Sequence, residues 1–212
     1  FDEPRKLTID TGVIPKAEGS ARARLGDTEV VAGVKIQPER PFPDTGDKGM
    51  LICTAEILPI AHPSAETGPP QPPVVELARV TDRGIRESGM LDMKQLVLEK
   101  DKSVIGIFCD NAVTDHDGNL FDACSYASTA AINSCKIPKY EMQDEKPVKI
   151  EGEFIEPPIT TLPVSVTMAK IGDFIVVDPT IEEWGIMDAR ITITSNSDGN
   201  VVELQKGGSD GF

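Results

Sequence analysis

The sequence predicts a mixed α+β fold in which helices pack on β-sheets. Strand-like segments dominate both ends of the 212-residue chain, and each end has a Gly-Asp hairpin turn, one at Gly26–Asp27 and one at Gly172–Asp173. Two stretches that favour helices, residues 74–91 and 121–135, lie between these turns. Because 39% of the residues are apolar, a chain of this length can bury the core of one large domain or of two small ones.

The first predicted elements are β-strands. Polar and apolar side chains alternate over residues 6–13, and residues 21–36 form two strands on either side of the first Gly-Asp turn. Residues 49–61 are apolar almost throughout, which indicates a buried strand.

The first predicted helix follows a loop. Residues 62–73 are rich in proline, which excludes regular structure there. The last two prolines, Pro72 and Pro73, suit the first turn of the helix at residues 74–91. Short strands are expected next, at residues 95–99 and 103–115.

The chain divides into three parts. Residues 1–138 form an N-terminal core whose second helix is rich in small residues that allow close packing on a sheet. Residues 139–161 are polar and contain prolines, so we expect a linker or an excursion from a sheet edge. Residues 162–212 form a second β group. The first part ends with helices and the last part does not. We therefore expect that the C-terminal helix corresponding to those of the first part is missing from this sequence.

Composition limits the function. The formal net charge of −14 at pH 7 means that the chain as a whole repels nucleic acid, so contact with RNA requires a local basic patch and help from a partner. No run approaches the roughly 18 apolar residues of a membrane span. The four cysteines form no C-x-x-C pair, so we expect buried free thiols in a reducing cytosol, a cytoplasmic protein, and no bound metal or other cofactor.

The stretch VTDHDGNLFDA, residues 113–123, links a predicted strand to a predicted helix. An EF-hand loop that began at Asp115 would need Gly and Glu at positions where the chain has Leu120 and Tyr126. Phosphate binding at the helix N-terminus is disfavoured, because two aspartates crowd that end and the loop has no Lys or Arg. Local chemistry favours Asp and Asn residues that cap the helix and shape the turn.

Three arginines in the first helix form a candidate binding face. They are spaced by four and three residues, which places them on one side of the helix: Arg79, Arg83 and Arg86. A guanidinium group suits bidentate contact with phosphate. The alternative is a solvated face that three neighbouring carboxylates neutralise: Glu76, Asp82 and Glu87.

Five stretches carry a resemblance that spans nearly the whole chain. In order, they are TGVIPKAEGSARARLGDTEVVAGVKI, PFPDTGDKGMLICTAEILPIAHP, ELARVTDRGIRESGMLD, DHDGNLFDACSYASTAA and VVDPTIEEWGIMDARITIT. Together they resemble the RNase PH family and, within it, the non-catalytic RNase PH-like subunit of the archaeal exosome. No single stretch identifies the family, but the occurrence of all five in this order makes the resemblance specific.

The resemblance implies an RNase PH-like fold of the ribosomal protein S5 domain 2-like type, with mixed sheets and packed helices. It also implies a hexameric ring of three heterodimers with a catalytic RNase PH-like paralogue, and a cap of RNA-binding subunits on one face. Such a complex degrades single-stranded RNA from its 3′ end with inorganic phosphate and releases nucleoside diphosphates.

The chain departs from the active family members at the phosphate loop. There the loop resembles D-G-G-T-R or D-A-G-T-R, and its hydroxyl and guanidinium groups hold the attacking phosphate. The matching residues here are Asp117, Gly118, Asn119, Leu120 and Phe121. Neither Leu120 nor Phe121 can donate a hydrogen bond to phosphate.

A second departure lies at the acidic site. Active members carry a stretch like D-L-N-x-x-E-D, and this chain has DPTIEEW, from Asp178 to Trp184. The first acid is present, but Trp184 occupies the last acidic position and cannot act as a general acid or bind a metal through a carboxylate. Glu182 and Glu183 are adjacent, so an alignment shifted by one residue would restore an acid there.

The resulting prediction is a non-catalytic subunit that structures its catalytic neighbour's active site and contacts the RNA backbone. The resemblance favours Arg79 and Arg83 as backbone contacts, whereas Arg86 contacts either RNA or a carboxylate such as Asp82. Two alternatives remain at this point: a phosphate-dependent 3′-to-5′ exoribonuclease in its own right, and a scaffold that makes no contact with RNA.

Overall fold

A six-stranded mixed sheet forms the larger layer of the molecule. The computed structural model describes residues 5–144, 146–209 and 211–212. Neighbouring strands of this sheet are antiparallel except β4 and β6, which run parallel. The sheet order is β1 (Leu7–Thr11), β2 (Gly19–Leu25), β3 (Thr28–Glu39), β6 (Ser103–Asp115) and β4 (Met50–Ile57), and β5 (Val97–Glu99) pairs with the end of β6.

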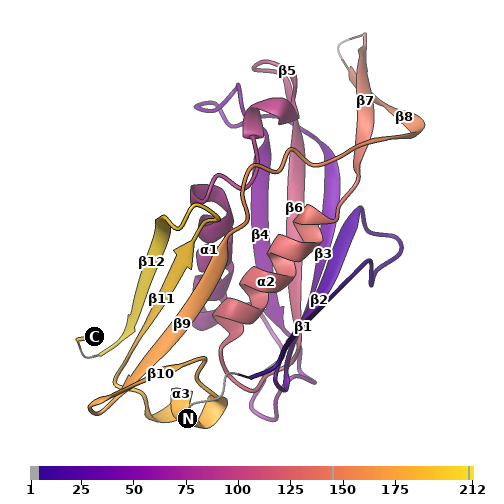
Figure 1. The fold of residues 1–212 in the computed structure, drawn as a ribbon. Helices are drawn as coiled ribbons and strands as arrows, with labels where there is room; N and C mark the ends of the chain where they lie inside the picture. Colours follow the sequence, from indigo (N-terminus) through magenta and orange to yellow (C-terminus); the bar gives the residue numbers. More distant parts are fainter. Residues whose placement is uncertain (1–4, 145, 210) are drawn as a thin grey trace.

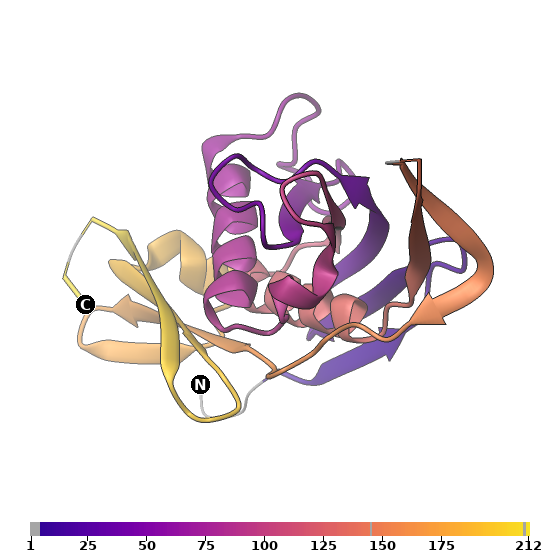
Figure 2. The ribbon, with the colours of Figure 1, turned by 90° about the horizontal axis from the view of Figure 1, so that it is seen from above.

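Two helices separate this sheet from a second one (Figures 1 and 2). Helix α1 (Pro72–Glu87) packs on β4 and α2 (Leu120–Asn133) packs on β2 and β3, and the two helices also contact each other. The second, antiparallel sheet has the order β10 (Phe174–Val177), β9 (Val164–Ile171), β11 (Ala189–Ser195) and β12 (Val201–Gly208). The remaining elements are η1 (Met93–Leu96), α3 (Ile181–Ile186), and the hairpin of β7 (Ile137–Gln143) and β8 (Lys146–Ile155).

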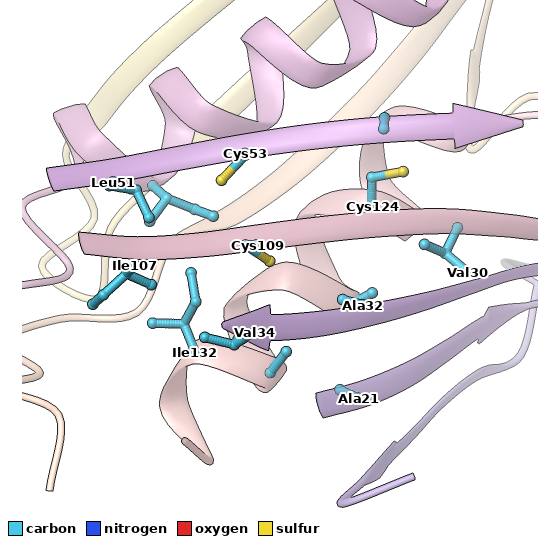
Figure 3. Packing of buried hydrophobic residues seen from close by; sticks show 14 of the residues in the cluster. Ala21, Val30, Ala32, Val34, Leu51, Cys53, Ile107, Cys109, Cys124 and Ile132 are labelled. Carbon is cyan, nitrogen blue, oxygen red and sulfur yellow. The ribbon is translucent and has the colours of Figure 1, made fainter. Parts of the chain in front are cut away.

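The main core lies between the first sheet and the helices. Alternate residues of β3, among them Val30, Ala32 and Val34, point toward the helices and are fully buried, as period-two geometry requires. Ile132 of α2 packs against them, and the small side chains on both sides allow the close approach seen in Figure 3. The mixed α+β fold predicted from the sequence is therefore confirmed.

The four cysteines are buried, as predicted, and none of them forms a disulfide. Burial raises the pKa of the Cys124 thiol well above its usual range, so it is held in the protonated, unreactive form. Among the described residues, no helix is long and apolar enough to cross a membrane. The same residues contain no group of three or more His, Cys, Asp or Glu side chains that could hold a metal ion.

The structure corrects two sequence predictions. The apolar strand expected to be buried is β4, which lies at a sheet edge and alternates buried with exposed residues, because α1 covers only one of its faces. The supposedly short strand at residues 103–115 is β6, a 13-residue strand in the interior of the sheet. The segment at residues 139–161, for which we expected a linker or an excursion from a sheet edge, contains most of the β7–β8 hairpin, and this hairpin projects from the body of the molecule (Figure 1).

The second sheet meets the helices through polar side chains. The residues of β9 and β11 that face inward include Ser165, Thr167, Thr192 and Thr194, and their hydroxyl groups are linked in pairs by hydrogen bonds of 2.9 Å. The Ser165 hydroxyl group also bonds to that of Ser125 on α2 at 2.9 Å. A polar seam between the two layers therefore runs directly beside the N-terminal half of α2.

Candidate functional site

The loop before α2 is shaped by two residues with left-handed backbone conformations. Gly118 has φ +91°, and a Cβ atom there would lie 2.5 Å from the carbonyl oxygen of Pro179, so only glycine fits. Asn119 has φ 44° and caps α2, since its side chain accepts a hydrogen bond from the Asp122 N–H. The prediction that Asp and Asn side chains cap this helix and shape the turn is confirmed for Asn119.

The two side chains that replace phosphate-binding groups are turned into the protein. Leu120 and Phe121 are only 9% and 6% exposed. Phe121 stacks on Trp184, with ring centroids 5.9 Å apart and an interplanar angle of 21°. The two departures from the active pattern, separated by 63 positions in the chain, are therefore in direct contact. An aromatic pair occupies this part of the loop, where active members place charged and hydroxyl groups.

A buried arginine that the sequence analysis did not single out completes this cluster. Arg190 is 5% exposed, and its Cζ atom lies 4.3 Å from the centroid of the Phe121 ring and 5.3 Å from that of Trp184. Its Nη2 donates to Glu76 at 2.7 Å, while its buried Nη1 has no hydrogen-bond partner among the described residues. The ring faces offset part of the cost of burying this cation. These side chains line a cavity of about 290 Å³.

The surviving acid, Asp178, is held by an arginine from the start of the chain. Arg5 binds it with two hydrogen bonds, Nε to Oδ2 at 2.8 Å and Nη2 to Oδ1 at 2.6 Å. Asn119 donates to the same Oδ1 at 2.7 Å, and Arg5 Nη1 donates to the Asp117 carbonyl oxygen at 2.7 Å. Arg5 therefore ties the degenerate loop to the degenerate acidic site, and the Asp178 carboxylate is occupied by internal partners.

The two glutamates near Trp184 lie on α3, a short helix that the sequence analysis did not predict. Glu183 forms a capping box: its carboxylate accepts from the Thr180 N–H at 2.9 Å, and its own N–H donates to the Thr180 hydroxyl group at 3.4 Å. Glu182 is exposed. Glu183 therefore has a structural role at the helix start, which the T-x-x-E spacing of residues 180–183 indicates.

Asp122, also missed from the sequence, is the most deeply buried carboxyl group of the site. It accepts hydrogen bonds from the Thr167 N–H at 3.0 Å, the Thr167 hydroxyl group at 2.8 Å and the Asn119 side chain at 2.8 Å. Burial raises its pKa to about 6, although these three donors favour the charged form. Asp122 therefore anchors α2 to β9 across the polar seam.

The arginine face of α1 lines an open hollow of about 860 Å³, and its three cations differ in their partners. Arg86 binds Asp82, with Nη2 to Oδ2 at 2.7 Å, and donates to the Leu51 carbonyl oxygen at 2.8 Å. Arg83 donates to Glu203 of β12 at 2.6 Å and to the side chain of Gln205 at 2.8 Å. Arg79 is exposed and has no ion pair or hydrogen bond within the described part of the chain.

The expected neutralisation within the helix is only partly correct. Of the three carboxylates named from the sequence, only Asp82 binds an arginine of this face. Glu76 instead binds Arg190 and the Gln205 side chain, and the carboxylate that binds Arg83 comes from β12. Burial raises the pKa of Glu203 even though Arg83 opposes the shift. Arg79 is thus the cation that this face leaves available.

The fold agrees with comparisons to known proteins. Residues 3–138 match the 3′ exoribonuclease family, domain 1, and residues 161–212 match domain 2 of that family. The chain belongs to the 3′ exoribonuclease, or RNase PH, family. Exosome complex component Rrp42 of Methanocella arvoryzae is 44% identical over 208 residues, covering 98% of this chain and 77% of that protein.

Solved structures show the same relationship. A chain of the Archaeoglobus fulgidus exosome with RNA bound to the active site matches with a TM-score of 0.91 and 47% identity, covering 100% of this chain and 80% of that one. Rice Rrp46 matches with a TM-score of 0.70 at 15% identity, covering 99% of this chain and 83% of that one, which shows the shared fold alone. The predicted RNase PH-like fold is confirmed.

Proposed function

We propose that this chain is a subunit of the archaeal exosome core that contacts the RNA backbone and does not itself carry out phosphorolysis. The packing of Phe121 on Trp184 carries the proposal, because the two positions that would bind phosphate and supply an acid are filled by one aromatic pair. The relatives named exosome complex component Rrp42, and the structural match to an exosome with RNA bound, support the assignment to this complex.

Phosphorolysis needs donors for the attacking phosphate, and this loop offers few. The side chains of Leu120 and Phe121 have no donor, and the Asp178 carboxylate is already bound by Arg5 and Asn119. A phosphate entering here would meet the carboxylates of Asp117 and Asp178, which repel it. The loop therefore acts as a folded connection between layers.

Arg79 is the residue through which the chain contributes to degradation. Its guanidinium group is exposed, lines the open hollow beside Arg83 and has no carboxylate partner among the residues that the structure describes. Contacts of this kind position an RNA backbone although the contacting residue takes no part in the reaction. Positioning of the substrate alone can contribute strongly to the rate of its degradation. Arg83 uses its Nε and Nη2 atoms for the hydrogen bonds to Glu203 and Gln205. Its Nη1 atom takes no part in these two bonds and can donate to a phosphate that Arg79 also contacts.

The proposal includes the assembly. The chain would alternate with a catalytic RNase PH-like paralogue in a hexameric ring of three heterodimers, carry a cap of RNA-binding subunits, and work in the cytoplasm. The net charge of −14 supports a need for partners, since the chain by itself repels RNA outside the arginine face. Its four buried free thiols fit a reducing compartment.

The test is charge reversal at Arg79 in the assembled ring. Arg79→Glu should weaken binding of single-stranded RNA roughly tenfold and slow its degradation, because an unpaired phosphate contact is replaced by a repulsive one. Lys100→Glu is the charge-matched control, since Lys100 is an exposed turn residue outside the hollow. Size-exclusion chromatography should show intact rings for both variants.

Unchanged binding and rates for Arg79→Glu would contradict the proposed RNA contact. They would favour the scaffold alternative, which has some support in the pairing of Arg83 and Arg86 with carboxylates. Ultraviolet crosslinking of RNA to the peptide that contains Arg79 would exclude that alternative.

A further inference from the structure

An exposed aromatic side chain lies on the wall of the hollow that the three arginines line. Phe42 belongs to the loop between β3 and β4, and its side chain is 49% exposed. It is not among the apolar residues that pack on the main core within the described chain. A large ring left half in water contributes little to stability, so its position calls for another explanation.

The backbone holds this ring in place. Pro41 and Pro43 flank Phe42, and each proline restricts both its own φ angle and the residue before it. The Phe42 carbonyl oxygen accepts a hydrogen bond from the Thr45 N–H at 3.0 Å. Further along the loop, the Gly46 carbonyl oxygen accepts from the Asp101 N–H at 2.9 Å, and the Gly49 N–H donates to Met93 at 2.7 Å. The exposed ring is therefore presented by a fixed loop, so binding against it costs little conformational entropy.

The same hollow combines apolar and cationic surfaces. Phe42 and the exposed Val75 form apolar parts of its lining, and Arg79 supplies a cation that no described residue pairs with. Proteins that bind single-stranded nucleic acid combine these two features, because each nucleotide offers a flat base face and a charged phosphate. A base-paired duplex offers no free base face, so the hollow should bind an unpaired strand in preference to a duplex.

We propose that Phe42 is a stacking platform for one base of the single-stranded RNA whose backbone contacts Arg79. The inference rests on the proposed function and adds a second, uncharged contact to it. Stacking on a ring tolerates any base, since every base has a π-face, so this contact grips RNA without reading its sequence.

The test measures binding of the assembled ring to a 5′-fluorescein-labelled RNA of about ten nucleotides. Phosphate is left out, so the RNA stays intact during the measurement. Phe42→Ala should weaken binding roughly 5- to 150-fold, the range found when a stacking side chain is removed. Phe42→Trp should bind at least as well as the unmodified ring, whereas Phe42→Leu should behave like Phe42→Ala if stacking is the cause.

Two further measurements separate stacking from charge. The slope of log affinity against log salt should be unchanged by Phe42→Ala, whereas Arg79→Glu should reduce it by about one or more, since of these two side chains only that of Arg79 is charged and displaces counterions. With an RNA that carries abasic sites throughout, Phe42→Ala should cause no further loss.

Each contrary result has a distinct meaning. If Arg79→Glu weakens binding and Phe42→Ala does not, the inference is overturned while the proposed function stands. If neither variant changes binding, both fail. If Phe42→Ala prevents assembly with the catalytic partner while its thermal unfolding is unchanged, Phe42 is a protein contact and the inference is overturned.

Discussion

The degenerate phosphate loop and the arginine face of α1 differ in how their polar groups are used. In the loop, Asn119, Asp122 and Asp178 bind one another or nearby backbone and side-chain donors, and Phe121 is covered by Trp184. On the arginine face, the Arg79 side chain has no partner in the described ranges of the chain, and Phe42 is half exposed. We infer that the loop no longer binds phosphate, since its polar side chains bond mostly to one another, and that the arginine face contacts a ligand, since it keeps groups that stability alone would not require.

The variant with the largest expected effect restores the arginine that active family members have in this loop. Phe121→Arg places a second guanidinium group in a buried position beside Arg190, which is itself only partly paired. We expect the free energy of unfolding to fall by about 4 kcal/mol, since an unpaired charge is buried. Urea denaturation measures this loss.

Phe121→Leu is the matched control for that variant. It keeps the site apolar and should cost only about 1 kcal/mol, through poorer packing on Trp184. A Phe121→Arg protein as stable as the unmodified chain would show that the loop still accommodates a phosphate-binding arginine.

A second variant tests whether Arg5 holds the two degenerate segments together. Arg5→Met removes the bidentate pair with Asp178, and within the described part of the chain it leaves that carboxylate only the Asn119 side chain as a donor. We expect a loss of about 3 kcal/mol, because both partners are mostly buried. Arg24→Met, which breaks an exposed pair with Glu29, should cost less than about 1 kcal/mol. Equal losses would contradict the account.

The smallest expected effect is a pH dependence at Asp122. Its folded pKa of about 6 is above the ordinary 3.8, so its protonated form stabilises the fold at low pH, and this contribution is lost as pH rises through about 6. In Asp122→Asn the dependence disappears. The unmodified chain should therefore gain about 2 kcal/mol relative to the variant as pH falls from about 6 to about 4. A constant difference in unfolding free energy over that range would show that folding does not raise the pKa of Asp122.

Much of the fold follows from local sequence signals. Both Gly-Asp hairpins, the helix start at Pro72 and the Asn119 cap are where the sequence predicts them, since each depends on residues within one turn or hairpin. Helix α3 was missed, because its six residues are too few for a periodic pattern. The burial of β4 was overestimated, since apolar composition does not reveal that a strand lies at a sheet edge.

The candidate sites could be located from sequence, but their partners could not. Helical spacing places three arginines on one face, yet the carboxylate that binds Arg83 lies on β12, 120 positions away. Likewise, nothing in the sequence indicates that Arg5 binds Asp178 or that Arg190 lies over Phe121. Contacts of this range depend on how the layers pack, and neither spacing nor composition encodes that directly. The contact between Phe121 and Trp184 belongs to the same class.

The central claim is that this chain supports RNA degradation without performing it. The most direct measurement is an assay of phosphorolysis on 5′-labelled single-stranded RNA. It compares this chain alone, the catalytic paralogue alone and the two together, each with and without inorganic phosphate. The account predicts release of nucleoside diphosphates only when the catalytic paralogue and phosphate are present, and faster release when this chain is added. Phosphate-dependent release by this chain alone would contradict it.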